Sequence, residues 1–238
     1  MNLLLLHPNQ RLDGDLWRLS ERQARHVRTV LHLDEGDRCR AGLLDGGTGD
    51  ARVESIKNNE IQLYLKVNSK PPPPLALNLL LALPRPKMLR RVLIDAASLG
   101  IKRIVLLNAW KVDKSYWHTP NLKLEALHEK LILGLEQAGD TLLPELILAP
   151  RFRPFVEDVL HGWAGPGPRL LAHPGDHPAL PRALPGPATL AIGPEGGWTP
   201  FEVELLQTHG FQAHRFGSRV LRVETALPAL VGRLMELP

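Results

Sequence analysis

The stretch LAIGPEGGWTPFEVELLQTHGFQAHRFGSRVLRVETA, residues 190–226, combines two apolar strands with two glycine-bearing loops. The apolar run 188–192 predicts a buried strand, which the loop 193–197 follows. A second strand is expected at 211–216, just before the loop 216–219. Open α/β sheets bind ligands at the carboxyl ends of their strands, and glycine lets backbone N–H groups approach a ligand closely. The two loops therefore indicate a ligand-binding crevice, although ordinary strand-to-helix turns would use the same residues.

Between the two loops the sequence predicts a helix with a well-defined start. Thr199 suits the N-cap, Pro200 suits the first helical position, and Glu202 completes a capping box. Gly210 is expected to end the helix. Neither loop matches G-x-G-x-x-G or G-x-x-x-x-G-K-[ST], so the dinucleotide-binding and P-loop classes lose their main support.

Two motifs carry a resemblance to a known family. They are GPEGG at 193–197 and GSRVLRVETA at 217–226. At this spacing they resemble the RsmE family, whose members are S-adenosylmethionine-dependent methyltransferases of the SPOUT superfamily. Those enzymes act on N3 of a uridine in small-subunit (16S) ribosomal RNA. The chain is weakly similar to the family over nearly its whole length.

The resemblance implies an α/β fold, with a C-terminal SPOUT-type parallel α/β domain that contains a deep trefoil knot and a small N-terminal PUA-like β-barrel domain. It further implies that S-adenosylmethionine binds in the knot, and that the protein is a homodimer whose active site is completed across the interface. Three loops would hold the cofactor. The residues that the resemblance assigns to it are Leu171, Ala172, His173, Ile192, Gly193, Pro194, Glu195, Gly196, Gly197, Phe216, Gly217, Ser218, Val220, Leu221 and Arg222.

Methylation of uridine N3 has two chemical requirements. The N3 proton must be removed, and the negative charge that develops on O2 and O4 must be stabilised by positioned donors. We hypothesise that Arg222 stabilises this charge, and that Glu195 or Glu224 is the base or orients the nucleotide. Glu195 could instead tie down its own loop. Glu224 could instead cap the last helix, where the helix dipole favours a carboxylate.

Residues 1–70 predict a small β-rich domain, and the family resemblance implies that it is the PUA-like domain that binds RNA. Turn signals at 36–37 and 45–50 separate short apolar runs, and 61–67 alternates apolar and polar residues as a half-buried strand does. A helix is expected to start at Ser20, and its arginines lie roughly along one face, which suits either phosphate contacts or a solvated surface. The candidate RNA-binding residues are Arg11, Arg18, Arg22, Arg25 and Arg28, with Lys87 and Arg90 in the following domain.

Four consecutive prolines, residues 71–74, predict a stiff linker, because proline cannot join a helix interior or a central strand. In 75–238 strands and helices alternate, which indicates a parallel α/β sheet. Besides the two strands already named, strands are expected at 75–83, 101–107, 146–149 and 169–172. The further expected helices are 86–99, 122–138, 152–163 and 226–234.

Composition limits the classes of protein and of site. The net charge of +4 permits RNA binding without requiring it. Cys39 is the only cysteine, and the ten histidines show no H-E-x-x-H spacing, so we expect neither an intrachain disulfide nor a metal site. No run approaches the roughly 20 apolar residues that span a bilayer. We expect a soluble cytoplasmic protein without a membrane partner.

Several positions outside the cofactor motifs depart from the family pattern. Residues 136–140, EQAGD, stand where the family usually has Glu-Gln-x-x-Arg, and 108–110, NAW, stand for Ser-Glu-Arg. Ala96 and Ser98 replace a Lys and a Glu. Asp140 in place of an arginine would repel a nearby phosphate. The leading prediction is a methyltransferase of 16S ribosomal RNA in the small ribosomal subunit. A different RNA target, or a non-catalytic RNA-binding or ribosome-assembly protein on the same fold, are the alternatives.

Overall fold

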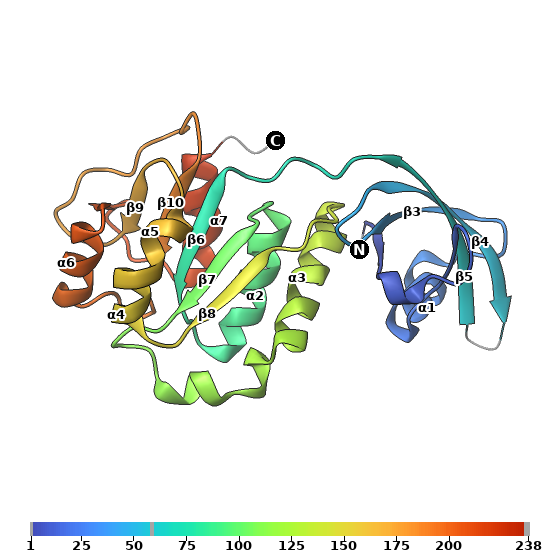
Figure 1. Cartoon of the computed structure of the whole chain (residues 1–238), viewed down its shortest axis with the longest axis horizontal. Helices are drawn as coiled ribbons and strands as arrows, with labels where there is room; N and C mark the ends of the chain where they lie inside the picture. The colour runs from blue at the N-terminus through green and yellow to red at the C-terminus, as the bar shows by residue number, and fades with distance from the viewer. Residues whose placement is uncertain (1, 58–59, 236–238) are drawn as a thin grey trace. The chain divides into compact units, whose positions relative to one another are not determined.

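The computed structural model describes residues 2–57 and 60–235, and the chain forms two compact units (Figure 1). One unit consists of Met1–Pro72 together with Ile132–Leu143. The other consists of Pro73–Leu131 together with Pro144–Pro238. The N-terminal unit is therefore discontinuous in sequence, since it includes the second half of helix α3 (Leu124–Ala138) and the residues that follow it.

The N-terminal unit is built on a five-stranded sheet with the order β1-β3-β4-β5-β2. β1 runs parallel to β3, and all other neighbours are antiparallel. A register shift between Val53 and Ser55 interrupts the long β4–β5 pair, and such bulges increase the local twist of a sheet. The strands are β1 (Leu4–Leu6), β2 (Leu16–Arg18), β3 (Arg38–Leu43), β4 (Thr48–Lys57) and β5 (Glu60–Ser69).

Alternation along the strands produces the core of this unit. On β5 the side chains of Ile61, Leu63 and Leu65 are buried, whereas the residues between them reach solvent. Trp17 and Val27 pack into the same core. The half-buried strand expected from the alternating pattern is thus confirmed.

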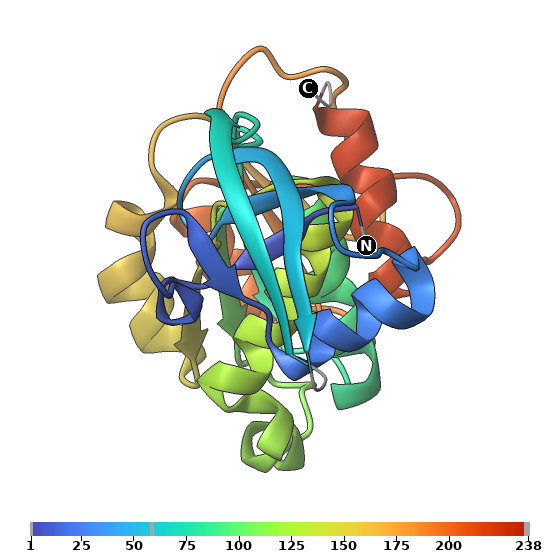
Figure 2. The same cartoon turned by 90° about the vertical axis from the view of Figure 1, so that its right-hand side faces the viewer.

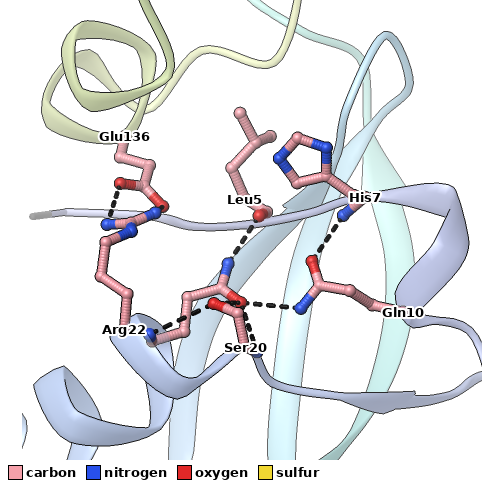
Figure 3. Close-up of polar contacts among 7 residues, drawn as sticks. Leu5, His7, Gln10, Ser20, Arg22 and Glu136 are labelled. Carbon is pink, nitrogen blue, oxygen red and sulfur yellow. Dashed lines mark hydrogen bonds and ion pairs between the residues drawn. The ribbon is translucent and has the colours of Figure 1, made fainter. Parts of the chain in front are cut away.

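Helix α1 (Glu21–His26) begins at Ser20, as predicted, and its start is fixed by a capping box. The side-chain oxygen of Ser20 accepts from the backbone N–H of Gln23, and Gln23 Oε1 accepts from the Ser20 N–H at 3.0 Å. Gln23 Nε2 donates to the carbonyl of Leu5 at 2.7 Å, so the same side chain joins α1 to β1 (Figure 3). Beyond His26 the helix continues as a π-helical turn, Val27–Leu31.

The second unit contains a six-stranded sheet with the order β11-β9-β10-β6-β7-β8, in which every pair is parallel. Its central strands β6, β7 and β10 are nearly continuous apolar runs, and every residue of β10 is buried, as expected for a sheet covered on both faces. The alternation of strands and helices predicted a sheet of this kind. The strands are β6 (Leu77–Ala82), β7 (Arg103–Leu107), β8 (Glu145–Ala149), β9 (Arg169–Ala172), β10 (Ala188–Ile192) and β11 (Phe211–His214).

Helices lie on both sides of this sheet. Helix α2 (Pro86–Ser98) buries Leu89, Val92 and Leu93 and packs against α7 (Val223–Leu234). The views in Figures 1 and 2 place the gold helical segment 152–164 on the side opposite the red helix α7. The remaining helical segments are α4 (Phe152–Pro154), the π-helical Phe155–Val159, α5 (Leu160–Ala164), α6 (Pro200–Thr208), and the 3-10 turns Pro8–Gln10, Lys114–His118 and Pro120–Leu122.

One predicted helix boundary is confirmed in atomic detail, and another is wrong. Thr199 caps α6, and the Glu202 carboxylate accepts from the Thr199 N–H at 2.8 Å, so the expected capping box forms. Helix α7 begins at Val223 rather than at the predicted residue 226. The earlier start puts Pro228 inside the helix.

Candidate active site

A cavity of about 300 Å³ lies at the carboxyl ends of β9 and β10 and beside the loop after β11. Its volume is at the lower end of the range for small-molecule sites. Both glycine-bearing loops line it. The lining residues are Ala172, His173, Pro174, Ile192, Gly193, Pro194, Glu195, Gly196, Gly197, Trp198, Phe216, Gly217, Arg219, Val220, Leu221, Val223, Ala226 and Leu230.

The structure brings most of the predicted cofactor residues together around this cavity. Leu171, Ser218 and Arg222 are the predicted residues outside its lining. Leu171 is buried within β9, and the other two directly neighbour lining residues. Helix α7 contributes a wall that was not predicted, through Val223, Ala226 and Leu230, which follow one another at helical spacing on one face. An earlier start for that helix would have revealed them.

Two glycines of the first loop allow close approaches that a side chain would prevent. A Cβ on Gly193 would lie 2.9 Å from Trp198 Nε1, so the indole packs directly on the backbone. Gly197 adopts a φ of +70° and donates its N–H to the Pro194 carbonyl at 2.8 Å, which closes the turn. The loop is therefore a rigid backbone cradle.

The cavity holds polar groups that have no partner among the described residues. The indole N–H of Trp198 and Nδ1 of His173 are both buried without a hydrogen bond in residues 2–57 and 60–235. Burial, together with the nearby charges of His177 and Lys111, lowers the pKa of His173, so its imidazole is neutral at pH 7. An unpaired buried polar group is costly, so these atoms fit a ligand that carries hydrogen-bonding groups beside an apolar surface. S-adenosylmethionine, with its adenine ring and polar amino-acid portion, has this character.

The three predicted catalytic residues lie at or next to the cavity. Glu195 lines it and is exposed, and its Oε1 accepts from the Arg85 N–H at 3.1 Å at the start of α2. Arg222 is the exposed N-cap of α7, with no side-chain capping bond. Glu224 lies in the first turn of α7, ahead of the predicted helix start at residue 226. Arg222 and Glu224 flank the lining residue Val223.

The predicted RNA-binding arginines of the N-terminal unit make contacts within that unit. Arg22 pairs with both carboxylate oxygens of Glu136, at 2.9 and 2.7 Å (Figure 3). Glu136 is only 1% exposed, so this guanidinium satisfies a buried carboxylate. The other pairs, Arg25–Glu21 at 2.9 Å and Arg18–Glu60 at 3.7 Å, are on the surface. Arg11 lies over the ring of Trp17, Arg28 lies in the π-helical turn after α1, and Lys87 and Arg90 are exposed on α2.

Asp140 has a structural role rather than the expected repulsive one. Its side chain is 2% exposed, and Oδ1 accepts from the backbone N–H groups of Thr141 at 2.6 Å and Leu142 at 3.0 Å. A buried carboxylate that caps its own turn does not face an RNA phosphate. The expectation that Asp140 weakens RNA binding by repulsion is therefore wrong.

Comparison with known proteins agrees with this architecture. A family model described as an RNA methyltransferase domain matches residues 71–235, and one described as an RNA methyltransferase PUA domain matches residues 19–65. The chain is 33% identical to ribosomal RNA small subunit methyltransferase E of Treponema pallidum, over 95% of this chain and 87% of that protein.

Solved structures show the same fold. A putative methyltransferase from Legionella pneumophila, solved with bound SAM, superposes with a TM-score of 0.75 at 26% identity, covering 96% of this chain and 94% of the other. Ribosomal RNA small subunit methyltransferase E from Neisseria gonorrhoeae, solved with S-adenosyl methionine, superposes with a TM-score of 0.73 at 22% identity, covering 96% and 95%. The predicted fold class, a SPOUT-type domain preceded by a PUA-like domain, is confirmed by these likenesses. Within the described residues, no helix has the length and apolar character needed to cross a bilayer.

Proposed function

This chain belongs to the ribosomal RNA small subunit methyltransferase E family, and we propose that it transfers a methyl group from S-adenosylmethionine to N3 of a uridine in 16S ribosomal RNA. The observation that carries the proposal is the cavity at the carboxyl ends of β9 and β10, which both glycine loops line. Its partner is the small ribosomal subunit, and its compartment is the cytoplasm, where that RNA is assembled.

The cofactor would be held by the backbone of the glycine loops and by the apolar face of α7. When bound, it supplies an electrophilic methyl group. The buried N–H of Trp198 can donate to it, and neutral His173 can donate or accept. Ile192 and Leu230 offer apolar surface to its rings.

The protein groups that act on uridine are proposed to come from the start of α7 and from the first glycine loop. Arg222 stands at the N-terminal end of α7, where the helix dipole adds to its positive charge, so it is suited to stabilising negative charge on O2 or O4. Glu195 or Glu224 removes the N3 proton. Glu195 already accepts one backbone hydrogen bond through Oε1, which leaves Oε2 for the nucleotide.

The PUA-like unit is proposed to bind the RNA outside the methylated nucleotide. We assign this role to Arg11, Arg18, Arg25 and Arg28, with Lys87 and Arg90 on α2, because each has a charged group at or near the surface. Arg22 contributes less, because its guanidinium is committed to Glu136. We further propose that two copies assemble as a homodimer, as the family resemblance implies.

Methyl transfer to small ribosomal subunits tests the function directly. Subunits that lack the uridine modification are incubated with the protein and labelled S-adenosylmethionine, and the modified base is mapped. Label at uridine N3 is the expected result. Cofactor binding without label at that base would refute the assignment and favour another RNA or a non-catalytic role.

Variants then test the catalytic roles. Arg222→Ala is expected to reduce kcat by about 100- to 1,000-fold, the usual effect of removing one oxyanion donor. The matched control is Arg182→Ala, an exposed arginine outside the cavity lining, which should retain full activity. Comparison of Glu195→Gln with Glu224→Gln identifies the base, because only one of them should lose the methyl-transfer step while keeping cofactor affinity. Turnover of Arg222→Ala within a few-fold of the unaltered protein would reject the role of Arg222.

A further inference from the structure

A second hollow, of about 460 Å³, lies on the same unit between the segment after β7, the start of α4 and the start of α6. Its floor contains Ala109 and Glu202, which are both buried. Four of its lining side chains are aromatic or planar: Trp110, Phe152, Phe201 and the guanidinium of Arg153. None of the catalytic or cofactor residues assigned above lines this hollow.

Trp110 is presented to solvent by a backbone that is firmly held. Its side chain is 86% exposed, the highest value among the large exposed apolar residues of the described chain. The Trp110 N–H donates to the buried Glu202 carboxylate at 2.7 Å, a charge-assisted bond that fixes the position of the residue. The adjacent Val112 N–H closes a turn by donating to Ala109 at 3.0 Å. Exposure of this indole is therefore a fixed feature of the fold, although tryptophan is normally well buried.

The segment that carries Trp110 is hydrogen-bonded to a loop that lines the cofactor cavity. Lys111 Nζ donates to the Gly196 carbonyl at 2.8 Å, and its side chain packs against the Gly196 backbone. Glu202 belongs to the helix that follows the glycine loop, and it holds both Thr199 and Trp110. The segment 108–111 is thus clamped onto the loop that lines the proposed methyl-transfer cavity.

The chemistry of the hollow suits an unpaired nucleobase. Flat aromatic walls stack on the face of any base. The Arg153 side chain is 69% exposed, and its Nε pairs with Glu157 at 2.7 Å, so the open face of the guanidinium can stack on a base. Asn108 is oriented by the Trp117 indole N–H, which donates to its Oδ1 at 2.9 Å. The amide Nδ2 group of Asn108 can then donate to a base edge.

We propose that Trp110 and Phe201 form a stacking site for a base of the RNA substrate next to the methylated nucleotide, and that Trp110 is a specificity-determining residue. This inference rests on the proposed function, which supplies the RNA and places it at the neighbouring cavity. The concave shape and the polar Asn108 in the lining favour a base over a flat apolar contact with a second copy of the chain.

The experiment measures RNA affinity and methyl transfer for Trp110→Ala, Trp110→Phe and the control Leu124→Ala. Leu124 is 52% exposed on the same unit and lies outside the hollow. The probes are a fluorescein-labelled single-stranded oligouridylate, read by anisotropy, and 16S ribosomal RNA in small subunits. We expect Trp110→Ala to weaken RNA binding and raise KM by about 5- to 150-fold, the usual value of one stacked base. Trp110→Phe should restore most of the affinity, because a phenyl ring also stacks, and Leu124→Ala should change nothing.

Two further measurements separate the possible outcomes. Titration of S-adenosylmethionine into Trp110→Ala should give the affinity of the unaltered protein, because Trp110 does not line the cofactor cavity. Sedimentation should give the same mass for both proteins. If Trp110→Ala changes the oligomeric mass and leaves RNA affinity unchanged, then Trp110 contacts a second copy of the chain, which overturns the inference. Equal RNA affinity of Trp110→Ala and the unaltered protein would also overturn it. If the unaltered protein fails to methylate, the proposed function falls, while a Trp110-dependent loss of oligonucleotide affinity would still uphold the stacking site.

Discussion

The ion pair between Arg22 and Glu136 gives a prediction that separates structure from RNA binding. Both carboxylate oxygens of Glu136 are bonded to the guanidinium, and the carboxylate is almost fully buried. Arg22→Ala removes the partner and leaves a charge without compensation. Breaking a buried pair in this way costs about 3–5 kcal/mol, and because the Arg22 side chain is 50% exposed, about 2–3 kcal/mol is expected here.

Local hydrogen exchange is the suitable assay, because a chain with two units need not unfold in one step. Peptides from β4 and β5 report the opening of the N-terminal unit, and peptides from β6 and β7 report the other unit. In Arg22→Ala the amides of β4 and β5 should exchange about 30- to 150-fold faster, which corresponds to 2–3 kcal/mol. The amides of β6 and β7 should keep their rates.

Two controls sharpen this prediction. Arg25→Ala, on the same helix, breaks a pair whose side chains are 69% and 86% exposed, so it should cost no more than about 0.5 kcal/mol. Arg22→Ala combined with Glu136→Met replaces the stranded charge by an apolar side chain and should recover most of the lost protection. The reasoning would be refuted if amide exchange is unchanged in Arg22→Ala while RNA affinity falls as much as in Arg18→Ala. Arg22 would then be assigned to RNA binding.

Three other predictions follow from single sites. Gly193→Ala places a methyl group 2.9 Å from Trp198 Nε1, so it should cost about 1–3 kcal/mol of stability and weaken S-adenosylmethionine binding in calorimetry. The pKa of His173 is lowered in the folded protein, so the unfolded chain binds this proton at a higher pH. Stability therefore falls as the pH drops below about 6.5. In His173→Gln, thermal unfolding between pH 7 and 5 should show a weaker dependence of stability on pH. Burial raises the pKa of the Cys39 thiol to about 11, so alkylation by iodoacetamide at pH 8 should be about 100-fold slower than for a free cysteine until the protein is denatured.

Sequence reasoning succeeded where the determining interactions are local. The capping box of Thr199 and Glu202 spans three residues, and it forms as expected. The apolar run of β10 likewise predicts its strand from only a few consecutive residues. The family motifs identified the loops of the cavity for the same reason, since each loop is a short continuous segment.

Sequence reasoning failed where interacting residues are far apart in the sequence, or where the backbone hydrogen-bond pattern of a helix changes. Arg22 and Glu136 are separated by 114 positions, so no local pattern distinguishes this arginine from its exposed neighbours. Asp140 stands at a position where the family usually has an arginine, yet its carboxylate is buried and caps a turn. The π-helical turns Val27–Leu31 and Phe155–Val159 leave no mark in the periodicity, because the same apolar residues would suit an ordinary α-helix.

The sequence-discontinuous N-terminal unit limits how genes of this type can recombine. A crossover or gene fusion at the proline run would carry residues 1–72 without 132–143. The transferred fragment would lose the acceptor of Arg22 and the Thr141 hydroxyl that donates to the Gly46 carbonyl. The N-terminal unit is therefore not a cassette that can be moved by itself, because residues 132–143 complete it.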